Sequence, residues 1–142
     1  MRNIIFIISL IFLISCDEVD ITQNTSRGLV INEFLTSNDE CCPDEFNDYD
    51  DWVELYNDTP DAIDIGGMYF TDTPNDDNPY QIPSTDPSKT TIPSKGYLLI
   101  WCDDDQEQGP MHVSKKLKKG GESIILISSD KLSIVDLSLI HI

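Results

Sequence analysis

Residues 51–56 read Asp-Trp-Val-Glu-Leu-Tyr, and this stretch decides the fold of the chain. Successive side chains of an extended strand point to opposite faces of a sheet. Val53 and Leu55 therefore share one face, and the alternate residues share the other: Trp52, Glu54 and Tyr56. Aromatic and β-branched residues in this alternation predict a strand with one apolar face.

Similar short apolar runs recur along the chain and are bounded by Asn, Asp, Gly and Pro. They are Leu29–Phe34, Ala62–Ile65, Met68–Thr71, Tyr97–Cys102, Ser123–Ser128 and Leu132–Val135. Gly66-Gly67 predicts a tight turn or bulge between two of these runs. The run Tyr97–Cys102 is continuously apolar, which predicts a strand buried on both faces. No long helical period follows residue 16, so helical crossovers between parallel strands are disfavoured. Six or seven short strands predict an all-β sandwich.

Length and charge limit the classes of function. The chain has 142 residues, with 26 acidic and 9 basic ones, and its formal net charge is −17. This length fits one domain. The acidic balance argues against a nucleic-acid partner and against docking on anionic lipid through a basic face, because phosphates are held by Lys and Arg. The sequence has two histidines, His112 and His141, which leaves few groups for acid–base chemistry near neutral pH.

The N-terminal segment Met1–Ser15 predicts a secretory signal peptide. A basic residue, Arg2, precedes an apolar run of 11 residues from Ile4 to Ile14. A helix that spans a bilayer needs about 20 residues, so this run is typical of a signal rather than of an anchor helix.

Leu13-Ile14-Ser15-Cys16 resembles a bacterial lipobox. The resemblance implies cleavage before Cys16 and acylation of that residue, and several acyl chains hold a protein firmly at a membrane. The acidic residues 17–20 resemble a signal for export to the outer face of the outer membrane. We therefore expect a lipid-anchored, surface-exposed protein of the bacterial outer membrane. Residues 16–27 predict a flexible tether, and residues 28–142 the folded domain.

Five sequence blocks in order resemble the lamin tail domain family. They are Leu29–Phe34, Asp51–Asn57, Ile63–Asp72, Ile92–Trp101 and Gly121–Leu126. The resemblance implies an immunoglobulin-like β-sandwich. It also implies an envelope or secreted module, since bacterial members often accompany nucleases, phosphatases or adhesion-type repeats.

Two segments depart from the family pattern. The run 115–120 is unusually basic, and Leu137–Ile142 stands where a further strand and a polar stop are expected. The second departure leaves two interpretations, a truncated C-terminus or residues foreign to the natural protein, and it makes the last strand uncertain.

The segment Asp39–Asp51 concentrates negative charge, with seven carboxylates among 13 residues. Such loops supply the oxygen ligands of Ca²⁺. The candidate ligands are Asp44, Glu45, Asp48, Asp50 and Asp51. The alternative is a solvated acidic loop, because the spacing is not that of an EF-hand. A second run, Asp103–Asp105, follows an apolar strand, and it is expected to approach the first.

Three cysteines remain besides Cys16. One of Cys41 and Cys42 can pair with Cys102, since an exported protein meets an oxidising environment. Free thiols and a metal–thiolate site with His112 are the alternatives.

We find no sequence motif for catalysis. A nucleophilic Cys102–His112 pair is disfavoured, because Asp103–Asp105 adjoin the thiol and oppose a thiolate. The lysines of 115–119 predict a solvated loop or a docking site for an acidic partner. We therefore expect a non-catalytic module that binds polysaccharide, matrix or an envelope protein. The alternatives are a calcium-stabilised spacer and an accessory domain of a separately encoded extracellular hydrolase.

Overall fold

The computed structural model describes residues 28–139. The expected signal peptide, the lipidated Cys16 and the tether lie outside the described residues, as do residues 140–142. The strands are β1 (Leu29–Leu35), β2 (Trp52–Asn57), β3 (Ile63–Asp64), β4 (Tyr69–Thr71), β5 (Tyr80–Gln81), β6 (Thr91–Ile92), β7 (Tyr97–Trp101), β8 (Ser123–Ile127) and β9 (Ile134–Leu139). The helical segments are α1 (Pro87–Thr90) and the 3-10 turn η1 (Gln106–Gln108).

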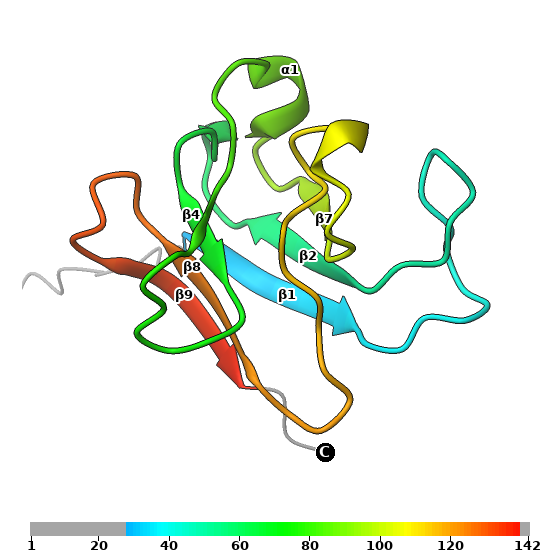
Figure 1. Cartoon of the computed structure of the whole chain (residues 1–142). Helices are drawn as coiled ribbons and strands as arrows, with labels where there is room; N and C mark the ends of the chain where they lie inside the picture. The colour runs from blue at the N-terminus through cyan, green and yellow to red at the C-terminus, as the bar shows by residue number, and fades with distance from the viewer. Residues whose placement is uncertain (1–27, 140–142) are drawn as a thin grey trace, which may run out of the picture.

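Two antiparallel sheets form a sandwich, as the sequence predicts. One has the order β1-β2-β7 and the other the order β5-β4-β8-β9, while β3 and β6 form a small third pair (Figure 1). Fully buried residues of both sheets share one apolar core, with Val53 and Ile100 from the first and Phe70 and Leu126 from the second. Burial of this apolar area is the main force that holds the two layers together.

Strand β2 confirms the predicted alternation. Val53 and Leu55 are fully buried in the core. Glu54 lies on the other face, where its Oε1 accepts a hydrogen bond of 2.8 Å from Nδ2 of Asn32. Trp52 and Trp101 are partners across β2 and β7, so the two largest rings of the chain share the outer face of this sheet.

Strand β1 contains a bulge between Ile31 and Glu33. The extra residue changes the side-chain alternation. As a result Ile31 and Phe34, which are three residues apart, both pack against the core.

Strand β7 differs from its prediction. The run Tyr97–Cys102 was expected to be buried on both faces, but β7 ends at Trp101 and Tyr97 is 55% exposed. The reason is the antiparallel sheet, which can leave one face open to solvent at its end.

The C-terminal strand also differs. Only the second half of the predicted run Leu132–Val135 lies in β9, which begins at Ile134 and pairs with β8 up to Leu139. The last strand, which the sequence left uncertain, is therefore present in the described part of the chain. Oδ2 of Asp136 accepts a hydrogen bond of 2.7 Å from the amide of Ile31, which joins β9 to β1 at one side of the sandwich.

The turn at Gly66-Gly67 is confirmed, and Gly67 has a φ of +87°, which favours glycine. No helix of the described residues is long and apolar enough to cross a membrane.

Candidate metal centre

Three segments meet beside the outer face of the β1-β2-β7 sheet. They are the acidic loop between β1 and β2, the turn that follows β7, and the segment 111–113. The amide of Cys102 donates to the carbonyl of Asp51 at 2.7 Å, which ties the loop to the turn. The amides of Trp101 and Val113 donate to the carbonyls of Met111 and Trp101, each at 2.8 Å, which ties 111–113 to β7. These backbone bonds fix the positions of the side chains that converge here.

His112 is the centre of this arrangement, and only 1% of its surface is exposed. Met111 and Val113 pack in the core, and His112 lies between them in sequence. Its ring stacks on Trp101, with centroids 6.5 Å apart, and meets the edge of Phe46 at 5.9 Å. The two aromatic rings shield the imidazole from solvent.

Asp103 orients the His112 ring. Nδ1 of His112 lies 2.5 Å from Oδ2 of Asp103, whose side chain is fully buried. The other oxygen of Asp103 accepts the amide of Asp105 at 3.0 Å. An ionised carboxylate can only accept, so Nδ1 is the donor of this bond, and in the tautomer with one proton, on Nδ1, Nε2 presents a lone pair. Nε2 is buried and has no hydrogen-bond partner among residues 28–139; Oε1 of Glu45 is 3.7 Å away.

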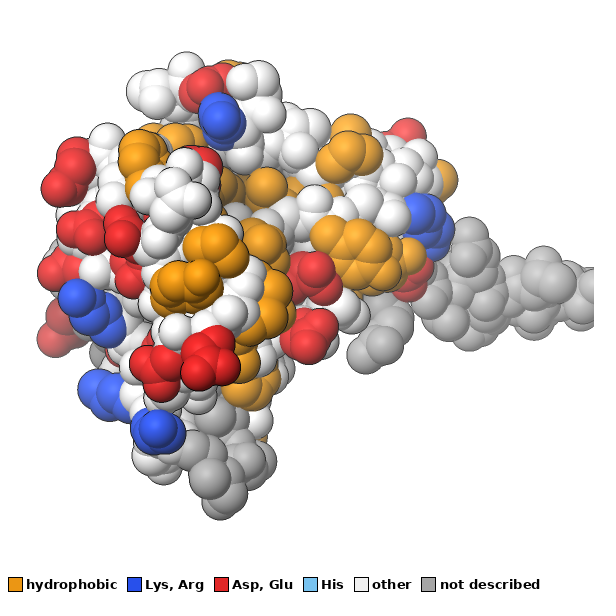
Figure 2. Space-filling view, turned by 90° about the vertical axis from the view of Figure 1, so that its right-hand side faces the viewer, with side chains coloured by type: hydrophobic (Ala, Val, Ile, Leu, Met, Phe, Trp, Pro, Cys, Tyr) orange, Lys and Arg blue, Asp and Glu red, His pale blue; other side chains and the backbone are white. Residues whose placement is uncertain are grey.

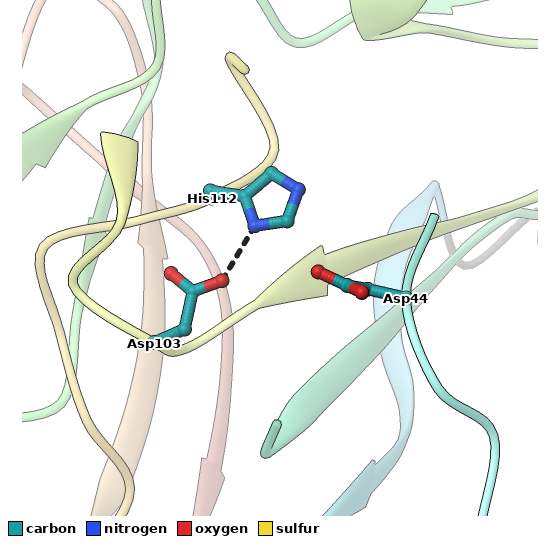
Figure 3. Close-up of side chains that lie close together, drawn as sticks. All are labelled: Asp44, Asp103 and His112. Atoms are coloured by element: carbon teal, nitrogen blue, oxygen red, sulfur yellow. Dashed lines mark hydrogen bonds and ion pairs between the residues drawn. The ribbon is translucent and has the colours of Figure 1, made fainter. Parts of the chain in front are cut away.

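Asp44 approaches the pair from the acidic loop (Figure 3). Its Oδ1 accepts hydrogen bonds from the amides of Phe46 and Asp48 at 2.8 and 2.9 Å. Its Oδ2 is buried and has no hydrogen-bond partner within the described part of the chain. One ligand atom from each of Asp44, Asp103 and His112 lies within 4.8 Å of the others.

A second group of carboxylates shares Asp44. One oxygen from each of Asp44, Asp48 and Asp50 lies within 4.8 Å of the others. Burial raises the pKa of Asp50 above its ordinary value, and repulsion by the neighbouring carboxylates, first that of Asp103, raises this pKa further. A cation near this group relieves the repulsion.

The candidate calcium ligands have different positions. The structure brings together Asp44, Asp48 and Asp50, and it places Glu45 near His112. Asp51 has another role, because its Oδ1 accepts the amide of Asn38 at 3.0 Å and its carbonyl binds Cys102. The approach of the 103–105 run to the acidic loop is confirmed by Asp103. The sequence suggested His112 as a partner of Cys102 in a metal–thiolate site or a nucleophilic pair. In the structure, His112 forms a hydrogen bond with Asp103 instead.

The considered disulfide is not formed, and Cys41, Cys42 and Cys102 are free thiols. Cys102 is buried in the core, whereas Cys41 and Cys42 are exposed on the acidic loop, so the backbone keeps them in different environments. Burial raises the pKa of the Cys102 thiol well above its ordinary value, and the nearby carboxylates add to this effect. Cys102 is therefore protonated at neutral pH, which opposes the nucleophilic role that the sequence already disfavoured.

A hollow of about 370 Å³ opens beside this centre. Its lining includes Tyr97, Leu99, Trp101 and Met111, with the charged side chains of Glu45 and Lys89. Figure 2 shows one face of the molecule, where hydrophobic side chains gather at the centre and acidic side chains lie at the left edge. Aromatic walls with a few charged groups are typical of ligand sites.

Part of the basic segment 115–119 has a structural role in the fold. Nζ of Lys115 lies 2.7 Å from Oδ2 of Asp76, and Leu117 is buried in the core. Lys116, Lys118 and Lys119 are exposed. Lys115 and Leu117 therefore have structural roles, and docking on this segment is left to the other three lysines.

Comparison with models of protein families gives a match. The sequence model of the Lamin Tail Domain family matches residues 22–139, which include every described strand. No curated protein matches the chain.

Proposed function

The chain belongs to the lamin tail domain family, and from this premise we propose that it is a lipid-anchored, non-catalytic binding module of the bacterial outer membrane. It is exposed at the cell surface, where it attaches to polysaccharide, with matrix and envelope proteins as the other classes of partner. Two features support the proposal, the lipobox at the N-terminus and the hollow on the sandwich.

The support for anchoring is the sequence around Cys16. A short apolar run, the residues Leu13-Ile14-Ser15 and an acidic stretch after the cysteine stand in the order of a lipoprotein signal. Several acyl chains on one residue anchor a domain without a spanning helix.

The observation that carries the binding function is the hollow next to β7. Tyr97 is 55% exposed, and its ring lies 4.7 Å from that of Tyr56, so the two rings form a platform at the solvent. Aromatic rings offer an apolar face to a ligand at little entropic cost, since few torsions are fixed. The carboxylate of Glu45 and the ammonium of Lys89 supply hydrogen bonds at the same hollow. This combination suits the apolar faces and hydroxyl groups of sugar rings.

Metabolic labelling tests the anchor. The full chain, expressed in a Gram-negative host with labelled palmitate, is expected to carry label and to fractionate with the outer membrane. The Cys16→Ser variant is expected to lose the label. An unlabelled wild-type chain contradicts the anchor, and a labelled chain that protease cannot reach on intact cells contradicts surface exposure.

A glycan array tests the binding function. The full chain in detergent is expected to bind a subset of polysaccharides, and Tyr97→Ala is expected to weaken this binding. Tyr49→Ala is the matched control, because Tyr49 is also half-exposed but does not line the hollow. Equal losses in both variants, or no glycan bound by the wild type, contradict a glycan site at this hollow.

A further inference from the structure

Two buried ligand atoms at the candidate metal centre lack partners. Nε2 of His112 and Oδ2 of Asp44 are both inaccessible to solvent, and neither has a hydrogen bond to any residue that the structure describes. In each residue the other polar atom is fixed, Nδ1 by Asp103 and Oδ1 by two backbone amides. The side chains are therefore held in place while their free atoms stay available. A buried acceptor without a donor is destabilising, so two such atoms at one place indicate a missing electrophile.

A protonated His112 does not account for both atoms. Nε2–H would point toward Glu45, but Oε1 of Glu45 is 3.7 Å away, which is beyond the usual hydrogen-bond range of about 2.7–3.2 Å. Such a proton would also leave Oδ2 of Asp44 without a partner. A metal ion accepts electron pairs from the nitrogen and from the oxygen together.

The donor set distinguishes between classes of metal. Ca²⁺ takes 6–8 oxygen ligands and does not favour imidazole, whereas imidazole with carboxylates suits Zn²⁺ and its first-row neighbours. A histidine whose Nδ1–H binds a buried carboxylate is the usual outer-shell arrangement of a zinc ligand. Ligands of one Zn²⁺ ion stand about 3–4 Å apart, and here a ring nitrogen of His112 and a carboxylate oxygen of Asp44 lie within 4.8 Å of each other. Glu45, with its side chain 56% exposed, is free to move inward as a further ligand.

We propose that Nε2 of His112 and Oδ2 of Asp44, completed by Glu45, bind a divalent first-row transition-metal ion of the Zn²⁺ class, with Asp103 as the residue that positions His112. The ion joins the acidic loop to the segment that follows β7. This proposed site differs from the sequence-derived calcium set in two ways, because it includes a nitrogen ligand and it omits Asp48, Asp50 and Asp51. The inference does not depend on the anchoring, and the metal site shares only Glu45 with the glycan hollow.

Metal titration of the full chain tests the proposal. The chain is purified in detergent, stripped with a chelator, and titrated with Zn²⁺ in a calorimeter and with Co²⁺ in a spectrophotometer. We expect one ion per chain and the visible absorption bands of cobalt with nitrogen and oxygen ligands. The Asp103→Asn variant is expected to bind about 10- to 100-fold more weakly, and His112→Gln is expected to lose the site.

Two control variants isolate the site. Asp77→Asn removes an exposed carboxylate that belongs to neither cluster, and its affinity should equal that of the wild type. Cys41→Ser combined with Cys42→Ser removes the exposed thiols, which bind zinc in their own right, and this double variant should also keep the site.

Four results would overturn the proposal. They are the absence of a Zn²⁺ or Co²⁺ complex, full affinity in a folded His112→Gln variant, loss of the site in the cysteine double variant, and displacement of Zn²⁺ by an equal concentration of Ca²⁺. Nitrogen NMR of the wild type provides the check if His112→Gln fails to fold. The Nε2 resonance of His112 should move on addition of Zn²⁺ while Nδ1 stays protonated, and an unmoved resonance at saturation refutes the site.

Discussion

Asn57 shows how one buried polar residue holds several loops. It is fully buried at the end of β2. Its Nδ2 donates to the carbonyls of Asp61, Ile92 and Pro93 at 2.8–3.1 Å. Its Oδ1 accepts the amide and the hydroxyl of Thr59 at 2.9 and 2.7 Å. The side chain therefore satisfies three carbonyls that would otherwise be partly unpaired.

Truncation of this side chain should destabilise the domain strongly. We expect Asn57→Ala to lower the free energy of unfolding by about 3 kcal/mol, because it removes the hydrogen bonds by which a fully buried side chain joins three backbone carbonyls and Thr59. Urea unfolding followed by the fluorescence of the tryptophans measures the change. The control is Asn32→Ala, which removes one exposed hydrogen bond to Glu54 and should lower it by less than about 1 kcal/mol. Equal losses in the two variants would contradict this role of Asn57.

The carboxyl of Asp76 makes the stability depend on pH. Hydrogen bonds from Lys115, Thr71 and the amide of Asn78 lower its pKa to about 2. A group whose pKa is lower in the folded chain stabilises the fold above its unfolded value, near 4, and this contribution is lost as the pH falls toward 2.

We therefore expect Asp76→Asn to lower the free energy of unfolding at neutral pH by about 1 kcal/mol. The difference from the wild type should shrink as the pH falls from about 4 toward 2, where the wild-type carboxyl also loses its charge. Chemical unfolding at several pH values measures it. Asp77→Asn, which alters an exposed neighbour, is the control. A difference that stays constant over this pH range would show that the carboxylate charge is not the cause.

At the scale of the strands, the side chain of Asp136 attaches β9 to β1. Its carboxylate accepts the amide of Ile31 across the side of the sandwich, where β1 and β9 belong to different sheets. Hydrogen bonds to a charged acceptor contribute about 1.5–3 kcal/mol. We expect Asp136→Ala to lower the free energy of unfolding by about 2 kcal/mol and to speed amide hydrogen exchange at Ile31. The exposed Asp39→Ala variant controls for the loss of one charge. Unchanged exchange at Ile31 would show that the bond does not fasten the two sheets.

The strands with five or more residues were mostly predictable, and of the shorter ones β3 and β4 lie within predicted runs whereas β5 and β6 do not. Strands β1, β2, β7 and β8 lie within or almost within predicted runs, because alternation over several residues carries a clear signal. Strands β5 and β6 have two residues each, which is too short for any period, and they form where tertiary pairing places them. Helix α1 has four residues, starting after the N-cap Asp86, and leaves equally little signal.

The candidate site was predictable only in its acidic half. The density of carboxylates in Asp39–Asp51 is visible in the sequence, and the structure gathers three of its predicted ligands. The role of His112 depends on long-range packing, since it lies 68 residues after Asp44 and reaches it through the turn after β7. Two signals were present, the early expectation that Asp103–Asp105 approach the acidic loop and the position of His112 between two apolar residues. The expected approach of Asp103–Asp105 to the acidic loop was reason enough to include Asp103 among the candidate metal-site residues.

At the scale of the whole molecule, charge opposes compaction. The chain carries a formal net charge of −17, and two sites that gather carboxylates lie close together beside one sheet. Mutual repulsion among like charges is stronger in the folded chain than in the expanded unfolded one. Salt screens this repulsion over about 10 Å at 0.1 M and about 30 Å at 0.01 M. Added salt should therefore stabilise the fold even when no metal is bound.

We expect the melting temperature of the chelator-treated chain to rise by about 5 °C between roughly 0.02 and 0.3 M sodium chloride, which corresponds to about 1 kcal/mol for a domain of this size. Choline chloride should have the same effect, because screening depends on ionic strength and not on the identity of the cation. Lys116 is exposed, so Lys116→Glu makes the net charge more negative by two without disturbing the core. The melting temperature of this variant should therefore rise more steeply with salt concentration. Differential scanning calorimetry measures all three cases. If sodium chloride stabilises the chain and choline chloride does not, the carboxylates bind the cation at a defined place, and screening is not the dominant effect.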